Sequence, residues 1–306
     1  MPDDRRNASL ATTPVPPAPA AARSEGLVVS VDASGLSDRG LKRANNEDHF
    51  LISRIDRTWH TLQTNVPAGA FPPSVTDSVT AQIVADGMGG KVGGEVASRT
   101  AIAAFVDIVQ RTPNLILRLD KQVTQDVLQR MARRFERVKE ALEEVVRLDP
   151  TLSGMGTTMT LACNFGADLL VAHVGDSRAY LFRQGHLERL TRDQTWVQLL
   201  REDGELTEAE VATHPMRHVL TGVLGTQGTP IDVELRFVHL EHGDQILLCS
   251  DGLTEMVTDA AIGEALAAAP TPADACRRLV EIAIENGGED NVTVVVSRYD
   301  IATSAV

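Results

Sequence analysis

The 306-residue sequence predicts an α+β fold whose sheets are antiparallel. Two observations support this prediction. Between residues 95 and 145, apolar side chains recur every three or four positions, which is typical of helices that face a core. After Pro150 the pattern changes to short apolar runs separated by turn residues, which is typical of strands in close succession. Such short connections favour antiparallel sheets over a parallel, doubly wound sheet.

The two ends of the chain are expected to be tails around one domain. From residue 7 to residue 22 nearly every residue is Ala, Pro, Thr or Ser, which is too little apolar bulk to offset the entropy of ordering. Residues 1–26 are therefore predicted to be a disordered tail. A single domain is expected over residues 27–300, and residues 301–306 are expected to form a C-terminal tail.

Two short strands open the predicted domain. The first begins at Leu27 with Leu-Val-Val-Ser-Val and is followed by the turn-rich segment 34–40, and the second follows Asp48. Residues 55–80 contain three prolines and a glycine with little periodicity. This composition predicts a long surface loop or an extended hairpin before a strand over residues 81–85. Partner docking by this insertion is the less favoured interpretation.

Helices and strands divide the rest of the chain. Helices are expected over residues 95–110 and 123–145, and a third over residues 259–268. A fourth, over 271–287, begins with a Thr-Pro pair, which supplies an N-cap and a first-turn proline, and ends at an Asn-Gly pair. The expected strands are 157–163, 169–174, 179–182, 233–238, 245–249 and 292–297.

The composition limits the classes of function. The 29 basic and 42 acidic residues give a net charge of −13, which disfavours a nucleic-acid-binding face and an anchor to anionic membranes. No apolar stretch approaches the roughly 20 residues of a membrane-spanning helix, and the first residues are acidic where a secretion signal would be basic. We therefore expect a cytoplasmic monomer. Its three scattered cysteines are expected to be reduced packing residues.

Four acidic residues stand at the ends of apolar runs. Asp86 and Asp251 each follow such a run and precede a glycine, Asp176 lies in Val-Gly-Asp-Ser, and Asp290 precedes Val-Thr-Val-Val-Val. A carboxylate at the end of a buried strand is costly unless a positive charge pairs with it, and few Lys or Arg residues accompany these acids. Oxygen ligands select hard cations such as Mg²⁺ or Mn²⁺. The alternative is that each Asp is an ordinary turn residue.

Five blocks of the sequence carry a family likeness. They are Ser-Asp-Arg-Gly-Leu-Lys-Arg-Ala-Asn-Asn-Glu-Asp (37–48), Ala-Asp-Gly-Met-Gly-Gly with Gly-Gly-Glu-Val-Ala-Ser (85–98), Gly-Met-Gly-Thr-Thr (154–158), His-Val-Gly-Asp-Ser-Arg-Ala-Tyr (173–180) with Thr-Arg-Asp-Gln-Thr (191–195), and Cys-Ser-Asp-Gly-Leu (249–253) with Asp-Asn-Val-Thr (290–293). In this order, over residues 27–299, the chain resembles the bacterial metal-dependent serine/threonine protein phosphatases of the 2C type (PPM family). The resemblance implies a four-layer α-β-β-α sandwich, with two central antiparallel sheets flanked by helices.

The resemblance also implies a centre of two metal ions, Mn²⁺ or Mg²⁺. In that centre Asp86 would bridge the two ions, and Asp251 and Asp290 would bind one of them. Glu47 and the carbonyl oxygen of Gly87 would serve the other ion. Two such ions lower the pKa of a bridging water molecule and neutralise the substrate phosphate.

Further roles follow from the same resemblance. Asp176 matches the ligand of a third, weaker metal ion. Asp48 would accept a hydrogen bond from metal-bound water, and Asn291 would orient the adjacent strand end. Arg43 lies where the family holds an arginine that grips the substrate phosphate. A planar guanidinium suits this role because it donates two charge-assisted hydrogen bonds, whereas Lys42 offers a point charge.

The sequence departs from the family pattern at several positions. Met88 replaces the histidine that animal members use as general acid, and Lys91 stands where bacterial members often have histidine. The candidates for the general acid are then a metal-bound water or Lys91. His49 is interpreted as a supporting or surface residue. Residues 197–224 resemble the family's mobile flap, but Thr221 stands where arginine is frequent.

The implied function is hydrolysis of phosphoserine and phosphothreonine in proteins by a metal-activated water. Such an enzyme would reverse a serine/threonine kinase in bacterial signalling or secretion control, so its partners would be phosphorylated proteins, among them the kinase and its substrates. One alternative is a regulatory or low-turnover binding member of the same fold. Another is a phosphatase of small phosphate esters.

Overall fold

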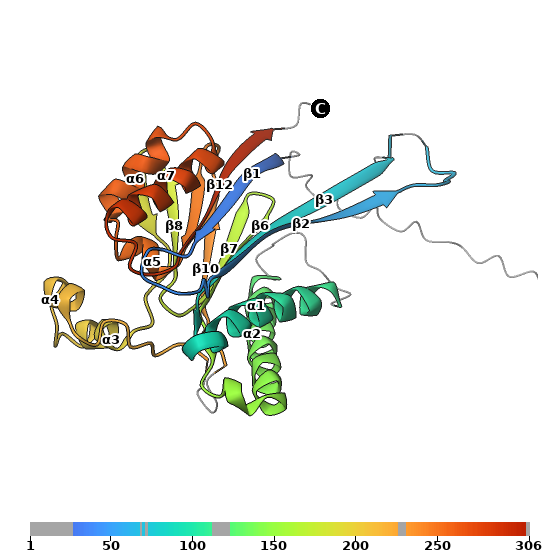
Figure 1. The fold of residues 1–306 in the computed structure, drawn as a ribbon. Coiled ribbons are helices and arrows are strands. Elements are labelled where there is room, and N and C mark those ends of the chain that lie inside the picture. The colour runs from blue at the N-terminus through green and yellow to red at the C-terminus, as the bar shows by residue number, and fades with distance from the viewer. Residues whose placement is uncertain (1–26, 68, 71–72, 112–122, 226–230, 304–306) are drawn as a thin grey trace, which may run out of the picture.

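The computed structural model describes residues 27–67, 69–70, 73–111, 123–225 and 231–303. Two five-stranded antiparallel sheets are stacked face to face, and helices cover the outer face of each sheet (Figure 1). Sheet A has the strand order β1-β12-β11-β8-β9, and sheet B has the order β10-β7-β6-β3-β2. The predicted α+β class and the four-layer sandwich are therefore confirmed. The predicted tail over residues 1–26 lies outside the described residues.

The strands are distributed as follows. Sheet A contains β1 (Leu27–Asp38), β8 (Arg178–Arg183), β9 (His186–Arg189), β11 (Gln245–Cys249) and β12 (Val292–Thr303). Sheet B contains β2 (His49–His60), β3 (Ser74–Ala85), β6 (Met159–Phe165), β7 (Asp168–Val174) and β10 (Glu234–His239). A third, two-stranded sheet pairs β4 (Gly87–Met88) with β5 (Gly156–Thr157).

Helices account for most of the remaining described chain. The two long helices α1 (Gly90–Gln110) and α2 (Val123–Leu148) pack on sheet B, and α6 (Asp259–Ala268) and α7 (Pro272–Glu285) pack on sheet A. Thr271 caps α7 by accepting a hydrogen bond from the backbone N–H of Asp274, as the Thr-Pro signal predicts. Short elements are a 3-10 helix (Pro150–Leu152), α3 (Trp196–Glu202), α4 (Glu208–Thr213) and α5 (Asp251–Thr254).

Strand β1 is longer than the sequence predicted. Residues 34–38 continue the strand, because they pair with β12 without interruption as far as Asp38 opposite Val292. Packing explains why this strand position is a glycine. A Cβ atom on Gly35 would lie 2.4 Å from the Phe50 ring of the facing sheet. The predicted C-terminal tail is also wrong in part. Residues 301–303 belong to β12 and pair with the first residues of β1, and residues 304–306 lie outside the described chain.

The predicted insertion over residues 55–80 is part of an extended hairpin, in which residues 55–60 and 74–80 belong to the strands β2 and β3. Strands β2 and β3 pair from His49 opposite Ala85 to His60 opposite Ser74, and their ends project from the body of the molecule (Figure 1). The surface-loop alternative is therefore wrong for these strands. Strand pairing ends at His60 and Ser74, and the chain reverses between them.

Three apolar cores hold the layers together. One lies between the two sheets, one between sheet B and α1 with α2, and one between sheet A and α6 with α7. Cys163, Cys249 and Cys276 are buried and free, which confirms that they are packing residues. No helix of the described chain is both long and apolar enough to cross a bilayer.

A polar network also joins the two sheets within their shared core. The fully buried Gln82 of β3 donates from Nε2 to the Ser297 hydroxyl (2.8 Å) and to the Tyr299 hydroxyl (3.2 Å) of β12. The Ser297 hydroxyl donates back to Oε1 of Gln82 (3.0 Å). Burial raises the pKa of Tyr299 to about 12, so its hydroxyl stays protonated.

We expect Gln82→Met to lower the free energy of unfolding by about 1–3 kcal/mol, because two buried hydroxyl groups lose their partner. Urea denaturation followed by circular dichroism measures this change. The double variant Gln82→Met/Tyr299→Phe should recover part of the loss, since one of those hydroxyls is then gone. A single variant as stable as the wild type would show that the network does not stabilise the stacking of the sheets.

Candidate metal centre

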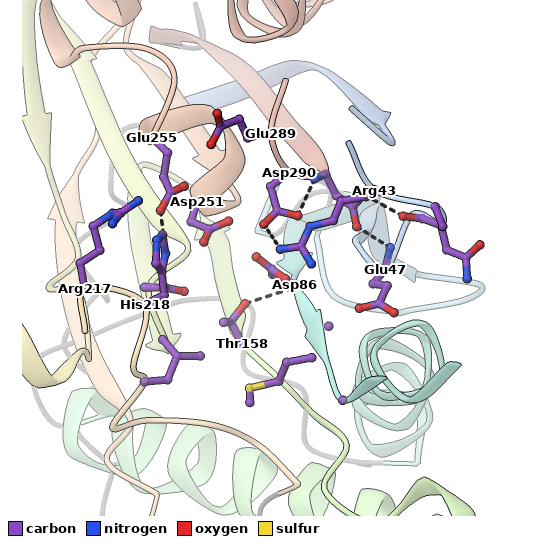
Figure 2. A pocket seen from close by; sticks show the side chains of 18 of the residues that line it. Arg43, Glu47, Asp86, Thr158, Arg217, His218, Asp251, Glu255, Glu289 and Asp290 are labelled. Atoms are coloured by element: carbon purple, nitrogen blue, oxygen red, sulfur yellow. Dashed lines mark hydrogen bonds and ion pairs between the residues drawn. The ribbon is translucent and has the colours of Figure 1, made fainter. Parts of the chain in front are cut away.

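The acidic residues predicted from the strand ends lie together around one pocket of about 990 Å³ (Figure 2). Asp86 follows β3, and Asp176 follows β7, both in sheet B. Asp251 begins α5 directly after β11, and Asp290 precedes β12, both in sheet A. The pocket thus lies where the ends of the two stacked sheets meet. Every predicted metal and phosphate ligand lines it: Arg43, Glu47, Asp86, Gly87, Asp176, Asp251 and Asp290.

The carboxylates crowd one another away from bulk water. Burial, then the neighbouring Asp48 and Asp251, raise the pKa of Asp86 well above its ordinary value. Burial and Asp251 do the same for the pKa of Asp176. The pKa of Asp251 is raised to about 6, again chiefly by burial, and its Oδ1 atom is buried without a hydrogen-bond partner in the described chain. Such a group calls for a cation.

Glu47 occupies a space that glycine residues leave open. A Cβ atom on Gly94, at the start of α1, would lie 2.4 Å from Oε2 of Glu47. A Cβ atom on Gly87 would lie 2.1 Å from the carbonyl oxygen of Gly94 and 2.7 Å from that of Glu47. Burial raises the pKa of Glu47, and the nearby Arg43 opposes this rise. These glycines therefore allow three backbone segments to meet beside the Glu47 carboxylate.

Asn291 holds the loop that carries Arg43 and Glu47. Its Oδ1 accepts a hydrogen bond from the backbone N–H of Glu47 (2.7 Å). Its Nδ2 donates to the backbone carbonyl oxygens of Arg39 (2.9 Å) and Asn45 (2.9 Å). The expected orienting residue thus ties residues 39–47 to the start of β12.

Asp48 lies beneath the pocket rather than on its wall. It is 4% exposed, and its Oδ2 accepts a hydrogen bond from the hydroxyl of Ser250 (2.7 Å), the residue before Asp251. The Ser250 hydroxyl in turn accepts from the backbone N–H of Thr293 (2.9 Å). Burial raises the pKa of Asp48 to about 7. Asp48 therefore fixes the turn that presents Asp251, and when it is ionised it opposes ionisation of Asp86.

Arg43 lies at the rim of the pocket. Its side chain is 56% exposed, and Nη2 donates to Oδ2 of Asp290 at 2.5 Å. This hydrogen bond raises the pKa of Arg43, so the guanidinium is charged. Arg43 thus brings a positive charge to the edge of a site rich in carboxylates.

Several residues of the pocket were not singled out from the sequence. His218 donates or accepts through Nδ1 at 2.8 Å from Oε1 of Glu255, and Arg217 and Glu289 lie beside this pair (Figure 2). The hydroxyl of Thr158 accepts from the backbone N–H of Asp86 (3.0 Å). Thr158 belongs to the sequence block 154–158 that carries the family likeness. The contact of His218 with Glu255 depends on tertiary structure, which the spacing of these residues in the sequence does not predict.

The predicted flap over residues 197–224 includes most of α3 and all of α4, which project from the body of the molecule (Figure 1). Bridges from Thr195 to Leu220 and from Thr157 to Leu224 hold its base. Thr221 is not among the described residues that line the pocket. Its backbone N–H donates to the carbonyl oxygen of Gln194 (2.7 Å).

Two positions that depart from the family pattern lie near the pocket. Met88 lines it and is 41% exposed. His49 lies on the other side of the Glu47 segment, where Nδ1 is 2.9 Å from the Ser98 hydroxyl, and burial lowers its pKa. This agrees with a supporting role for His49. The side chain of Lys91 lies outside the described part of the structure.

The fold and the site define a known class of protein. A family model described as protein phosphatase 2C matches residues 71–282, so the chain belongs to this family. It is 38% identical over 263 residues to the serine/threonine protein phosphatase PstP of Mycobacterium tuberculosis, and the match covers 85% of this chain and 43% of PstP. The chain therefore spans less than half the length of this relative.

Other relatives match over nearly their whole length. The serine/threonine phosphatase Stp of Listeria monocytogenes is 31% identical over 265 residues, which cover 87% of this chain and 94% of Stp. The crystal structure of the catalytic domain of PstP in complex with two manganese ions is similar, with a TM-score of 0.69 and 35% identity over 89% of this chain and all of that domain.

We expect Gly94→Ala to raise the Mn²⁺ concentration required for half-maximal binding about tenfold, because its methyl group would displace the Glu47 carboxylate. Isothermal titration calorimetry of the chelator-treated protein with Mn²⁺ measures this change. Gly93→Ala is the matched control, since its Cβ atom would approach Met155, with the Cβ atom of Met155 at 3.2 Å, and not Glu47. Equal Mn²⁺ affinity in both variants would argue against Glu47 as a ligand.

Proposed function

We propose that this chain hydrolyses phosphoserine and phosphothreonine in proteins and that it uses Mn²⁺ or Mg²⁺. The observation that carries the proposal is the convergence of Asp86, Asp176, Asp251 and Asp290 on one pocket, with a buried Asp251 oxygen left without a partner. Membership of the protein phosphatase 2C family and the names of its relatives support the same activity.

The donor atoms fit divalent cations. All the candidate ligands are oxygen atoms, which hard cations prefer. Asp86, Asp251 and Asp290 would hold one ion, and Asp86 with Glu47 and the Gly87 carbonyl oxygen would hold a second. Asp176 would contribute to a third, weaker site on the other side of Asp251, whose charge already raises the pKa of Asp176. When bound, such ions neutralise phosphate charge and make a water molecule more acidic.

Arg43 would bind the substrate phosphate. Its guanidinium reaches Asp290 and is held there by a loop that Asn291 fixes in place. A phosphate at the mouth of the pocket would meet this charge and could accept two hydrogen bonds from it. Asp48 would accept a hydrogen bond from a water molecule held near Asp86.

The proposed partners are phosphorylated proteins, among them a serine/threonine kinase and its substrates, and we propose a cytoplasmic monomer. The net charge of −13 disfavours nucleic acid as a partner. No observation favours the alternative of a binding member without turnover, because the pocket contains every acid that the catalytic interpretation requires.

The test is phosphate release from a phosphothreonine peptide. We expect release with Mn²⁺ or Mg²⁺, none with excess EDTA, and recovery when Mn²⁺ is restored. Asp86→Asn should lower kcat at least a hundredfold, because the amide keeps the shape of the side chain but not its charge. Full activity in EDTA, or near-normal turnover by Asp86→Asn, would contradict the proposal.

A second kinetic test separates phosphate binding from metal binding. We expect Arg43→Ala to raise KM about tenfold with little change in the Mn²⁺ requirement, since the lost bonds go to the substrate. Arg43→Lys should recover only part of that loss. Asp176→Asn should lower kcat, raise the Mn²⁺ requirement and change KM less. If Arg43→Ala left KM unchanged and altered the Mn²⁺ requirement, Arg43 would not be the phosphate ligand and the role given to Asp176 would also be contradicted.

A further inference from the structure

A second cavity, of about 230 Å³, lies between sheet B and the helices α1 and α2. No described residue lines both this cavity and the metal pocket. Helix α1 runs between them: Val92 reaches the metal pocket, whereas Phe105, Val109 and Gln110 line the cavity. At a rise of about 1.5 Å per residue, roughly 20 Å of helix separates the two. The cavity is therefore a site of its own.

Most of the cavity wall is apolar. Sheet B contributes Ile55, Val79 and Phe165, and the helices contribute Phe105 and Met131, among others. All of these except Ile55 are less than 10% exposed. An apolar cavity of about 150 Å³ stays dry and is large enough to bind benzene. The present cavity has room for a longer hydrocarbon group.

Three arginines line this cavity: Arg54, Arg130 and Arg134. Arg134 lines the cavity from α2 and is partly buried, and no hydrogen bond or ion pair joins its guanidinium to another residue of the described chain. Arg54, at the same cavity, differs because it donates to Asp56 (2.8 Å) and Ser78 (3.1 Å). Burial lowers the pKa of Arg134, which reflects the cost of holding a guanidinium away from water.

The described lining of the cavity includes no compensating acid. None of the described residues that line it is Asp or Glu, although acidic residues outnumber basic ones in the whole chain by 42 to 29. A positive charge beside an apolar wall is complementary to a molecule with one anionic end and one hydrocarbon end. A carboxylate is the anion that a planar guanidinium binds with two parallel hydrogen bonds.

We propose that this cavity binds a medium-chain aliphatic carboxylate, with its hydrocarbon chain between sheet B and the two helices and its carboxylate on Arg134. The chain would fill the space beside Met131 and Phe105, and the carboxylate would neutralise the guanidinium. The proposal is independent of phosphatase activity, since it involves none of the residues of the metal pocket.

The test is isothermal titration calorimetry of the full chain with decanoate, below its micelle concentration. We expect one decanoate per chain and at least tenfold weaker binding of 1-decanol, which has the same hydrocarbon chain without the charge. Arg134→Gln should weaken decanoate binding to the level of 1-decanol and leave 1-decanol binding unchanged. Arg133→Gln, which removes the adjacent exposed arginine of α2, is the matched control and should bind decanoate normally.

A second pair of variants tests the location. Ala81→Leu places extra bulk in the cavity and should weaken both ligands at least tenfold. Ser53→Leu does the same from the edge strand β2, where the fold tolerates change more readily, and circular dichroism confirms folding of each variant. The proposal would be overturned if the wild type showed no detectable decanoate binding. It would also be overturned if Arg134→Gln, or a folded cavity-filling variant, bound decanoate as the wild type does. Tighter binding of an acidic, apolar peptide than of decanoate would overturn the ligand class.

Discussion

Mutual repulsion among partly buried carboxylates is the constraint on which the structure around the pocket depends. Asp86 and Asp176 come from sheet B, and Asp251 and Asp290 come from sheet A, so neither sheet alone brings the charges together. Each acid raises the cost of ionising its neighbours, and burial adds to that cost. The stacked sheets must supply the energy that holds these groups in place, through the apolar core between them and the Gln82 network.

Hydrogen bonds to the backbone hold the same arrangement locally. Thr158 fixes the peptide of Asp86, Ser250 links Asp48 to β12, and Asn291 joins the loop of Glu47 to the start of β12. These bonds position the carboxylates without neutralising them. A divalent cation that binds only the folded chain would therefore stabilise it by mass action.

Local patterns in the sequence predicted the parts that depend on local physics. The helices at 259–268 and 272–285 follow from capping residues and apolar spacing, and the acids at strand ends follow from the cost of burying unpaired charge. The extension of β1 past Gly35 was not predictable from the sequence. The glycine there leaves room for the Phe50 ring of the other sheet, which is a tertiary contact. The contact of His218 with Glu255 was missed for the same reason, since it joins the flap to α5 through tertiary packing.

The first and last strands of the domain, β1 and β12, pair with each other. Sheet A can therefore be completed only at the end of synthesis. All strands of sheet B precede residue 240, whereas sheet A needs β12, which ends at Thr303 and pairs with β1 at Leu27. A nascent chain therefore presents Asp86 and Asp176 well before Asp251 and Asp290 can join them. The candidate metal centre is therefore complete only once β12 is in place.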